Sequence, residues 1–346
     1  MKNNILLIGH LGLSKNLFDG QTGKTRNVLK LLQSKSASFK SVNYFDTQEF
    51  RSSKLSFFQM IYRLIKCNVL VYLPERNNLK YLFPFIYIIC KLKGIKIVYL
   101  VVGGWLDDYL HSKQLVISML SEIKGIFTES NQLTNNLKDH HNLQNVITFP
   151  NFRMHNFIPS FNQNADAFKI VYMARIFKEK GVDVVFRLAE HIQKKLGTEH
   201  PISIDFYGPI QVDEDSYFRE ELRKYSFVSY KSVLEPDHIY ETLEQYDLLV
   251  LPSRYSNEGF PGTIMDAYIS GIPVIISNWM FMPEYVENGS SGYIFDLNKE
   301  EDFYSLVDSL YNDRMKLLKM KHSAFEKSKE YSSEVAWQIL EPYLVN

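Results

Sequence analysis

The sequence predicts an α/β protein made of two doubly wound, Rossmann-like domains. Short apolar runs rich in β-branched residues alternate with helical patterns along all 346 residues. Such alternation is typical of parallel sheets covered by helices on both faces. The length corresponds to about two domains of roughly 150 residues. Residues 151–168, rich in Asn, Pro, Ser and Phe, interrupt the alternation and are the predicted linker.

Residues 1–150 are predicted to form the first domain. Each apolar run is short enough to be a buried strand and is followed by a segment of helical periodicity. The expected strands are 4–8, 41–45, 69–73, 95–102, 125–128 and 145–149. The expected helices are 23–34, 55–67, 78–93, 113–122 and 131–140.

Residues 169–331 repeat the pattern and are predicted to form the second domain. The expected strands are 170–174, 202–207, 227–230, 248–252, 273–277 and 293–295. The expected helices are 181–196, 215–225, 237–245, 262–270, 300–312 and 314–329. Two such domains would face each other across a cleft, with ligands at the carboxyl ends of the strands.

The composition indicates a soluble cytoplasmic protein. Hydrophobic residues make up 45% and charged residues 23% of the chain, which excludes disordered, collagen-like and coiled-coil classes. The longest apolar run, residues 81–90, is shorter than the roughly 20 residues of a membrane span. The only two cysteines, Cys67 and Cys90, lie in apolar stretches, which suits a reducing compartment.

The net charge of zero argues against a nucleic-acid partner, but the two halves of the chain carry opposite net charges. Residues 1–150 carry 19 basic and 9 acidic side chains, whereas residues 151–346 carry 20 and 30. Cations cluster around the apolar helices expected at 55–67 and 78–93. They are Lys54, Arg63, Lys66, Lys80, Lys91, Lys93 and Lys96. This pattern suits an anionic membrane surface; the alternative is a solvated basic face.

A glycine-rich loop follows the first strand and ends in Gly23-Lys24-Thr25. Three interpretations remain open: a P-loop, a loop that needs glycine only for its turns, and a loop that approaches a ligand in the cleft. A P-loop requires glycine where Phe18 stands. We expect no metal site and no cofactor. Asp213-Glu214-Asp215 looks like a metal-binding DxD motif but leads into a helix. Acidic side chains are favoured in the first turn of a helix, which explains them without a metal.

Two loops at strand ends in the second domain carry the informative side chains. Arg175 and Lys180 follow the strand at 170–174, where two cations can neutralise a diphosphate. Glu258 follows the strand at 248–252 and precedes a helix that contains Asp266. Backbone amides near Gly262 can bind phosphate, and the two carboxylates can bind sugar and ribose hydroxyls.

These motifs together resemble glycosyltransferase family 4, which has the GT-B fold. The resemblance rests on segments between 170 and 296. They are Arg175-x4-Lys180-Gly181, Phe206-Tyr207-Gly208-Pro209, Glu258-Gly259-Phe260-Pro261, Gly271-Ile272-Pro273-Val274, Pro283-Glu284-Tyr285-Val286, Asn288-Gly289 and Gly292-Tyr293. The resemblance also implies that the terminal helix, 332–346, packs back on the first domain.

The resemblance implies retaining, metal-independent transfer of a sugar from a UDP- or GDP-sugar to a glycan or lipid-linked acceptor. Arg175 and Lys180 would stabilise the departing diphosphate, and Glu258 would contact the donor sugar. The remaining donor-binding positions would be Gly23, Gly208, Gly259, Phe260, Pro261, Gly262 and Asp266. The implied process is cell-surface polysaccharide biosynthesis.

The sequence departs from the family in three places, one of which is Trp279-Met280-Phe281-Met282, where many members have glycines. Asp266 replaces the usual glutamate, and Val102-Gly103-Gly104-Trp105 stands where many members have a histidine. Asp107 or Asp108, just beyond, could face the acceptor. Two other functions remain in play: a non-catalytic nucleotide-sugar-binding subunit, and another GT-B reaction such as epimerisation or phosphorolysis.

Overall fold

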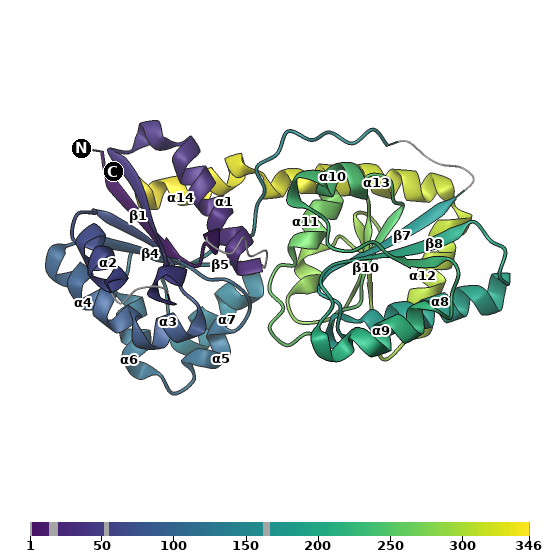
Figure 1. Cartoon of the computed structure of the whole chain (residues 1–346). Coiled ribbons are helices and arrows are strands. Elements are labelled where there is room, and N and C mark those ends of the chain that lie inside the picture. The colour runs from purple at the N-terminus through teal and green to yellow at the C-terminus, as the bar shows by residue number, and fades with distance from the viewer. Residues whose placement is uncertain (1, 14–19, 52–54, 162–166, 346) are drawn as a thin grey trace. The chain divides into compact units, whose positions relative to one another are not determined.

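The computed structural model describes residues 2–13, 20–51, 55–161 and 167–345. The chain divides into two units (Figure 1). Unit 1 comprises Met1–Met154 and Tyr331–Asn346, and unit 2 comprises His155–Glu330. Part of the glycine-rich loop, part of the predicted linker and Lys54 lie outside the described residues.

Unit 1 is built on a parallel six-stranded sheet of order β2-β1-β3-β4-β5-β6. The strands are β1 (Asn4–Gly9), β2 (Ser41–Asp46), β3 (Val69–Leu73), β4 (Lys96–Leu100), β5 (Gly125–Thr128) and β6 (Val146–Thr148). Every residue of β3 and β5 is buried, which explains their continuous apolar sequences. The order places β1 between β2 and β3, as in a doubly wound fold.

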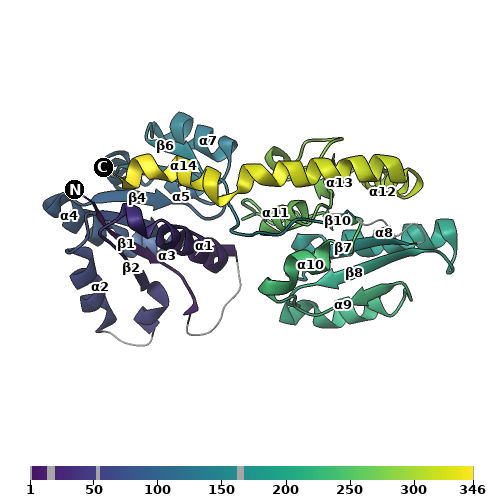
Figure 2. The same ribbon diagram turned by 90° about the horizontal axis from the view of Figure 1, so that it is seen from above.

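Helices cover both faces of this sheet. They are α1 (Gly20–Ser34), α2 (Ser56–Leu64), α3 (Arg76–Tyr81), α4 (Phe83–Lys93), α5 (Leu106–Leu110), α6 (Gln114–Ser121), α7 (Asn131–His141) and α14 (Ser333–Leu344). The view from above shows α1 and α14 in front of the strands (Figure 2). Trp337 and Leu340 of α14 join one core cluster with Val28 and Leu32 of α1. The terminal helix therefore packs on unit 1.

Unit 2 repeats the architecture with the order β12-β11-β10-β7-β8-β9. Its strands are β7 (Phe168–Met173), β8 (Ile202–Tyr207), β9 (Val228–Tyr230), β10 (Leu248–Leu251), β11 (Val274–Ser277) and β12 (Gly292–Phe295). Its helices are α8 (Val182–Leu196), α9 (Asp215–Leu222), α10 (Ile239–Leu243), α11 (Gly262–Ile269), α12 (Glu300–Asn312) and α13 (Arg314–Ser328). Strands β7 and β10 are direct neighbours in this sheet.

The structure differs from the expected elements of unit 1 in three places. The single helix expected at 78–93 is two helices, α3 and α4. Pro84 explains the break, because proline has no N–H to donate within a helix but is tolerated in the first turn of a new one. Helix α5 was not predicted, since five residues are too few to show a period. Helix α1 begins at Gly20 rather than at residue 23.

Among the described residues, no helix combines the length and the apolar character that crossing a bilayer requires.

Candidate active site

The loop after β7 passes against the end of β10, and a glycine makes this approach possible. Gly181 has φ +82°, and a Cβ at this position would lie 2.1 Å from the carbonyl oxygen of Pro252. The Arg254 N–H donates to the Glu179 carbonyl at 2.7 Å, which links the two loops. This contact brings Lys180 to the residues that follow β10.

Replacing Gly181 by alanine is expected to destabilise unit 2 by at least about 2 kcal/mol. Left-handed backbone costs a non-glycine residue about 1–2 kcal/mol, and the contact with Pro252 adds to this cost. Gly94→Ala is the matched control, because Gly94 also has left-handed backbone, with φ +67°, and open space around its Cβ position. Urea denaturation measures the difference; equal losses would contradict the close approach.

Lys180 and Glu258 form a buried ion pair. The Lys180 Nζ donates to Glu258 Oε1 at 2.8 Å and to Oε2 at 2.6 Å. Their side chains are only 11% and 7% exposed. Ser253 Oγ donates to Oε2 at 2.8 Å, so the carboxylate accepts three hydrogen bonds. The two residues are 78 positions apart in sequence and meet because β7 and β10 are neighbours.

Arg175 completes a cationic group at the same strand ends. Its guanidinium lies 5.2 Å from the Phe177 ring centroid and 5.5 Å from that of Tyr255. The Lys180 Nζ lies 5.1 Å from the Tyr255 ring. Within the described parts of the chain, no ion pair involves Arg175, and the residue is exposed. The predicted residues Arg175, Lys180 and Glu258 therefore gather around one tyrosine, with Arg175 on the solvent side.

The segment after Glu258 leads directly into α11. Gly259 and Gly262 are half-buried, and α11 begins at Gly262 after Pro261, so its first N–H groups lie next to the ion pair in sequence. The buried Phe260 ring stacks on Tyr285, with centroids 3.7 Å apart, which ties this segment to the unit's core.

Asp266 is buried in the second turn of α11. Gly208 lies at the end of β8 with φ +134°, and a Cβ there would lie 1.9 Å from the Ala174 carbonyl oxygen. Gly208 thus allows the backbone after β8 to lie against the loop that carries Arg175. Ser253 and Tyr255 belong to the same group, although no role was predicted for them from the sequence. Their position directly after a predicted strand was the signal that could have identified them.

The first-domain predictions require one correction. Gly23 lies in the first turn of α1 rather than in a loop ahead of it. Lys24 is buried, donates to Glu129 Oε1 and to the Val101 carbonyl, both at 2.9 Å, and burial lowers its pKa. Lys24 Nζ is directed at Glu129 and the Val101 carbonyl, whereas a P-loop lysine is directed at a phosphate, which disfavours that interpretation. Asp107 is buried and bonded to histidines, whereas Asp108 is exposed.

Asp213-Glu214-Asp215 stands at the start of a helix. Val212–Glu214 form a 3-10 turn that leads into α9, and Asp215 pairs with Arg219 one turn later at 2.9 Å. This is the placement expected for helix-starting acids.

The chain shares sequence and fold with known glycosyltransferases. Residues 161–327 match the family model described as "Glycosyl transferases group 1". The capsular polysaccharide biosynthesis glycosyltransferase CapM of Staphylococcus aureus is 24% identical over 181 residues, which are 51% of this chain and 45% of CapM. The GtfA subunit of the UDP-N-acetylglucosamine–peptide N-acetylglucosaminyltransferase of Streptococcus pneumoniae is 26% identical over 38% of this chain and 25% of its own length. The chain aligns with less than half of each relative.

Among solved structures, HepE from Anabaena in complex with UDP-glucose superimposes with a TM-score of 0.74. The match covers 99% of both chains at 13% identity. The two parallel sheets and this likeness show that the protein has the GT-B fold, and the chain resembles group 1 glycosyltransferases of that fold.

Proposed function

From the resemblance of this chain to group 1 glycosyltransferases of the GT-B fold, we propose that it is a retaining glycosyltransferase. It transfers a hexosyl or N-acetylhexosaminyl group from a UDP- or GDP-sugar to a glycan or polyprenyl-linked acceptor in cell-surface polysaccharide biosynthesis. The observation that carries this proposal is the grouping of Arg175, Lys180 and Glu258 around Tyr255. The role of CapM in capsular polysaccharide biosynthesis and the UDP-glucose bound by HepE support it.

The proposed chemistry uses protein cations in place of a metal ion. Arg175 is exposed and pairs electrostatically with the diphosphate of the donor, stabilising the negative charge that develops as the sugar leaves. The diphosphate also draws Lys180 away from Glu258, since it supplies the negative charge that the carboxylate provides in the free protein. Glu258 then accepts hydrogen bonds from donor-sugar hydroxyls. The same grouping favours catalysis over a subunit that only binds the donor.

Screening UDP- and GDP-sugars by thermal shift tests the proposal. A ligand present at about 100 times its dissociation constant stabilises the folded protein by roughly 2.7 kcal/mol. We expect one nucleotide-sugar to raise the melting temperature in wild type. We expect a smaller shift in Arg175→Ala, which lacks the exposed cation. If none of these donors raises the melting temperature, the proposal that the protein binds a nucleotide-sugar is wrong.

We further propose that unit 1 attaches to an anionic membrane surface on the cytoplasmic side, where lipid-linked acceptors are presented. Two stripes of exposed apolar side chains support this proposal, each repeating every three or four residues along α2 and α3–α4. They are Leu55, Phe58, Tyr62 and Ile65, and Tyr81, Phe85, Ile88 and Leu92. Figure 1 shows α2 and α4 beside one another on the lower side of the unit 1 sheet. Lys91 contributes less charge than the sequence indicated, because it pairs with Glu122 at 2.6 Å.

We expect binding to phosphatidylglycerol vesicles that weakens as salt is raised, because each nearby cation contributes about 1 kcal/mol. The double variant Phe58→Ser, Phe85→Ser should bind at least about tenfold more weakly, since both exposed rings lose contact with the acyl boundary. Phosphatidylcholine vesicles are the charge control in the co-sedimentation assay. Failure of the wild type to bind phosphatidylglycerol vesicles at low salt would leave only a solvated basic face, and equal binding of wild type and variant would exclude the apolar stripes from the contact.

A further inference from the structure

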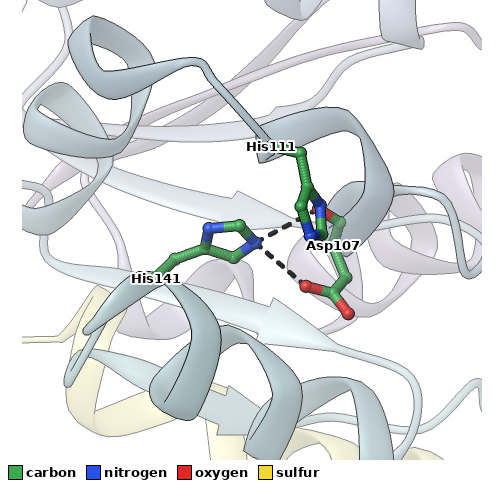
Figure 3. A group of neighbouring side chains, drawn as sticks. All are labelled: Asp107, His111 and His141. Carbon is green, nitrogen blue, oxygen red and sulfur yellow. Dashed lines mark hydrogen bonds and ion pairs between the residues drawn. The ribbon is translucent and has the colours of Figure 1, made fainter.

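Helices α5 and α7 of unit 1 bring together three side chains with metal-binding atoms. Asp107, His111 and His141 each offer one such atom, and these atoms all lie within 4.8 Å of one another. Figure 3 shows the His141 ring directed at Asp107 and His111. Asp107 and His141 are buried and His111 is exposed, so the group opens to solvent on one side.

The hydrogen bonds orient the two imidazoles. His111 Nδ1 lies 3.0 Å from the Asp107 carbonyl oxygen. A carbonyl only accepts, so Nδ1 carries the proton and Nε2 keeps a free lone pair. His141 Nε2 lies 2.9 Å from Asp107 Oδ1 and 3.1 Å from the Asp107 carbonyl oxygen, so this nitrogen carries a proton when no ion is bound. Both imidazoles therefore contact Asp107, His111 through the carbonyl oxygen and His141 through the carbonyl and one carboxylate oxygen.

Two further side chains hold the carboxylate in place. Asn136 Nδ2 donates to Asp107 Oδ2 at 3.0 Å. His140 Nδ1 lies 3.1 Å from Oδ1 and 3.2 Å from Oδ2. Outer partners of this kind orient the ligands of metal sites. Without an ion, His140 and His141 share one carboxylate. A bound cation would replace the proton on His141 Nε2, because a histidine nitrogen binds a metal only when it is unprotonated.

We propose that Asp107 Oδ1, His111 Nε2 and His141 Nε2 bind a divalent transition-metal ion, with Zn²⁺ as the best match. Imidazole nitrogen favours zinc over magnesium or calcium. Tetrahedral coordination with bonds of about 2.0 Å places ligand atoms about 3.3 Å apart. The 2.9 Å between His141 Nε2 and Asp107 Oδ1 therefore widens by only a few tenths of an ångström. Water takes the fourth position, on the exposed side.

The proposed ion has a structural role that is separate from sugar transfer. It joins α5 to the end of α7, which lies 34 residues further along the chain. All three ligands belong to unit 1, whereas Lys180 and Glu258 belong to unit 2. Because the site exists only in the folded state, binding stabilises unit 1.

Titration of metal-free, tag-free full-length protein with ZnCl₂ tests the proposal by calorimetry, and CoCl₂ provides an optical spectrum of the coordination. We expect one equivalent bound per chain, a tetrahedral cobalt spectrum and a higher melting temperature with Zn²⁺. His111→Ala should abolish stoichiometric binding while the protein stays folded, since this side chain is exposed. His140→Ala should weaken binding by roughly 10–100-fold, as loss of an outer partner does.

His238→Ala is the matched control, because His238 is exposed and lies in unit 2. It should bind Zn²⁺ like wild type. Absence of stoichiometric Zn²⁺ binding by the wild type would overturn the proposal. Unchanged affinity in His111→Ala would overturn the assignment of the ligands. Neither outcome depends on glycosyltransferase activity.

Discussion

Replacing Lys180 by methionine is expected to lower the free energy of unfolding by about 3–5 kcal/mol. The substitution leaves the buried Glu258 carboxylate without its cation, and removing one partner of a buried ion pair costs this much. Urea denaturation followed by circular dichroism measures the loss. Adding Glu258→Gln should restore part of it, because the uncompensated charge is then removed.

Lys194→Met is the matched control for this experiment. Lys194 pairs with Glu190 on the surface of the same unit, where the two side chains are 73% and 49% exposed. Exposed pairs contribute about 0–1 kcal/mol, so the control should be almost neutral. A similar small loss in Lys180→Met would mean that Lys180 and Glu258 do not remain paired in solution.

Arg175→Ala is expected to slow transfer by about 10²-fold with little change in stability. One charge-assisted contact to the leaving diphosphate is worth about 3 kcal/mol in the transition state, which corresponds to this factor. The side chain is exposed, so its loss leaves no buried group without a partner. The measurement is the release of nucleoside diphosphate from the donor found by thermal shift.

Lys178→Ala separates this effect from a general loss of positive charge. Lys178 is exposed in the same loop, but its Nζ lies over the Tyr217 ring, 4.5 Å from the centroid, instead of over Tyr255. We expect it to retain nearly full turnover. Arg175→Lys should recover part of the rate, because it keeps the charge and loses the planar fork. If Arg175→Ala turns over at the wild-type rate, Arg175 takes no part in the mechanism.

Much of the fold could be predicted from local sequence. Strands such as 69–73 and 202–207 end where predicted, because a continuous apolar run is a local signal of a strand buried on both faces. Predictions failed where local signals were short or ambiguous. Helix α5 has five residues, and α1 begins three residues before its predicted start, because Gly20 favours a loop over a helix.

The site could be predicted only in part. Arg175, Lys180 and Glu258 follow strands, and strand ends of a parallel sheet face one edge. Asp107, His111 and His141 were missed as a group, since Asp107 lies in a five-residue helix, His111 caps its end and His141 lies far along the chain. No compact metal-binding motif marks such a set.

The sequence by itself determined the order of the elements and the loops that carry chemistry, because periodicity and strand-end position are local properties. Only the tertiary structure decided which loops meet. Lys180 reaches Glu258 because β7 lies beside β10, although β8 and β9 separate these strands in sequence. Lys24 of α1 reaches Glu129, 105 residues away, across the ends of β4 and β5. Strand neighbours are set by crossover connections and packing of the whole sheet, so a linear sequence does not reveal them.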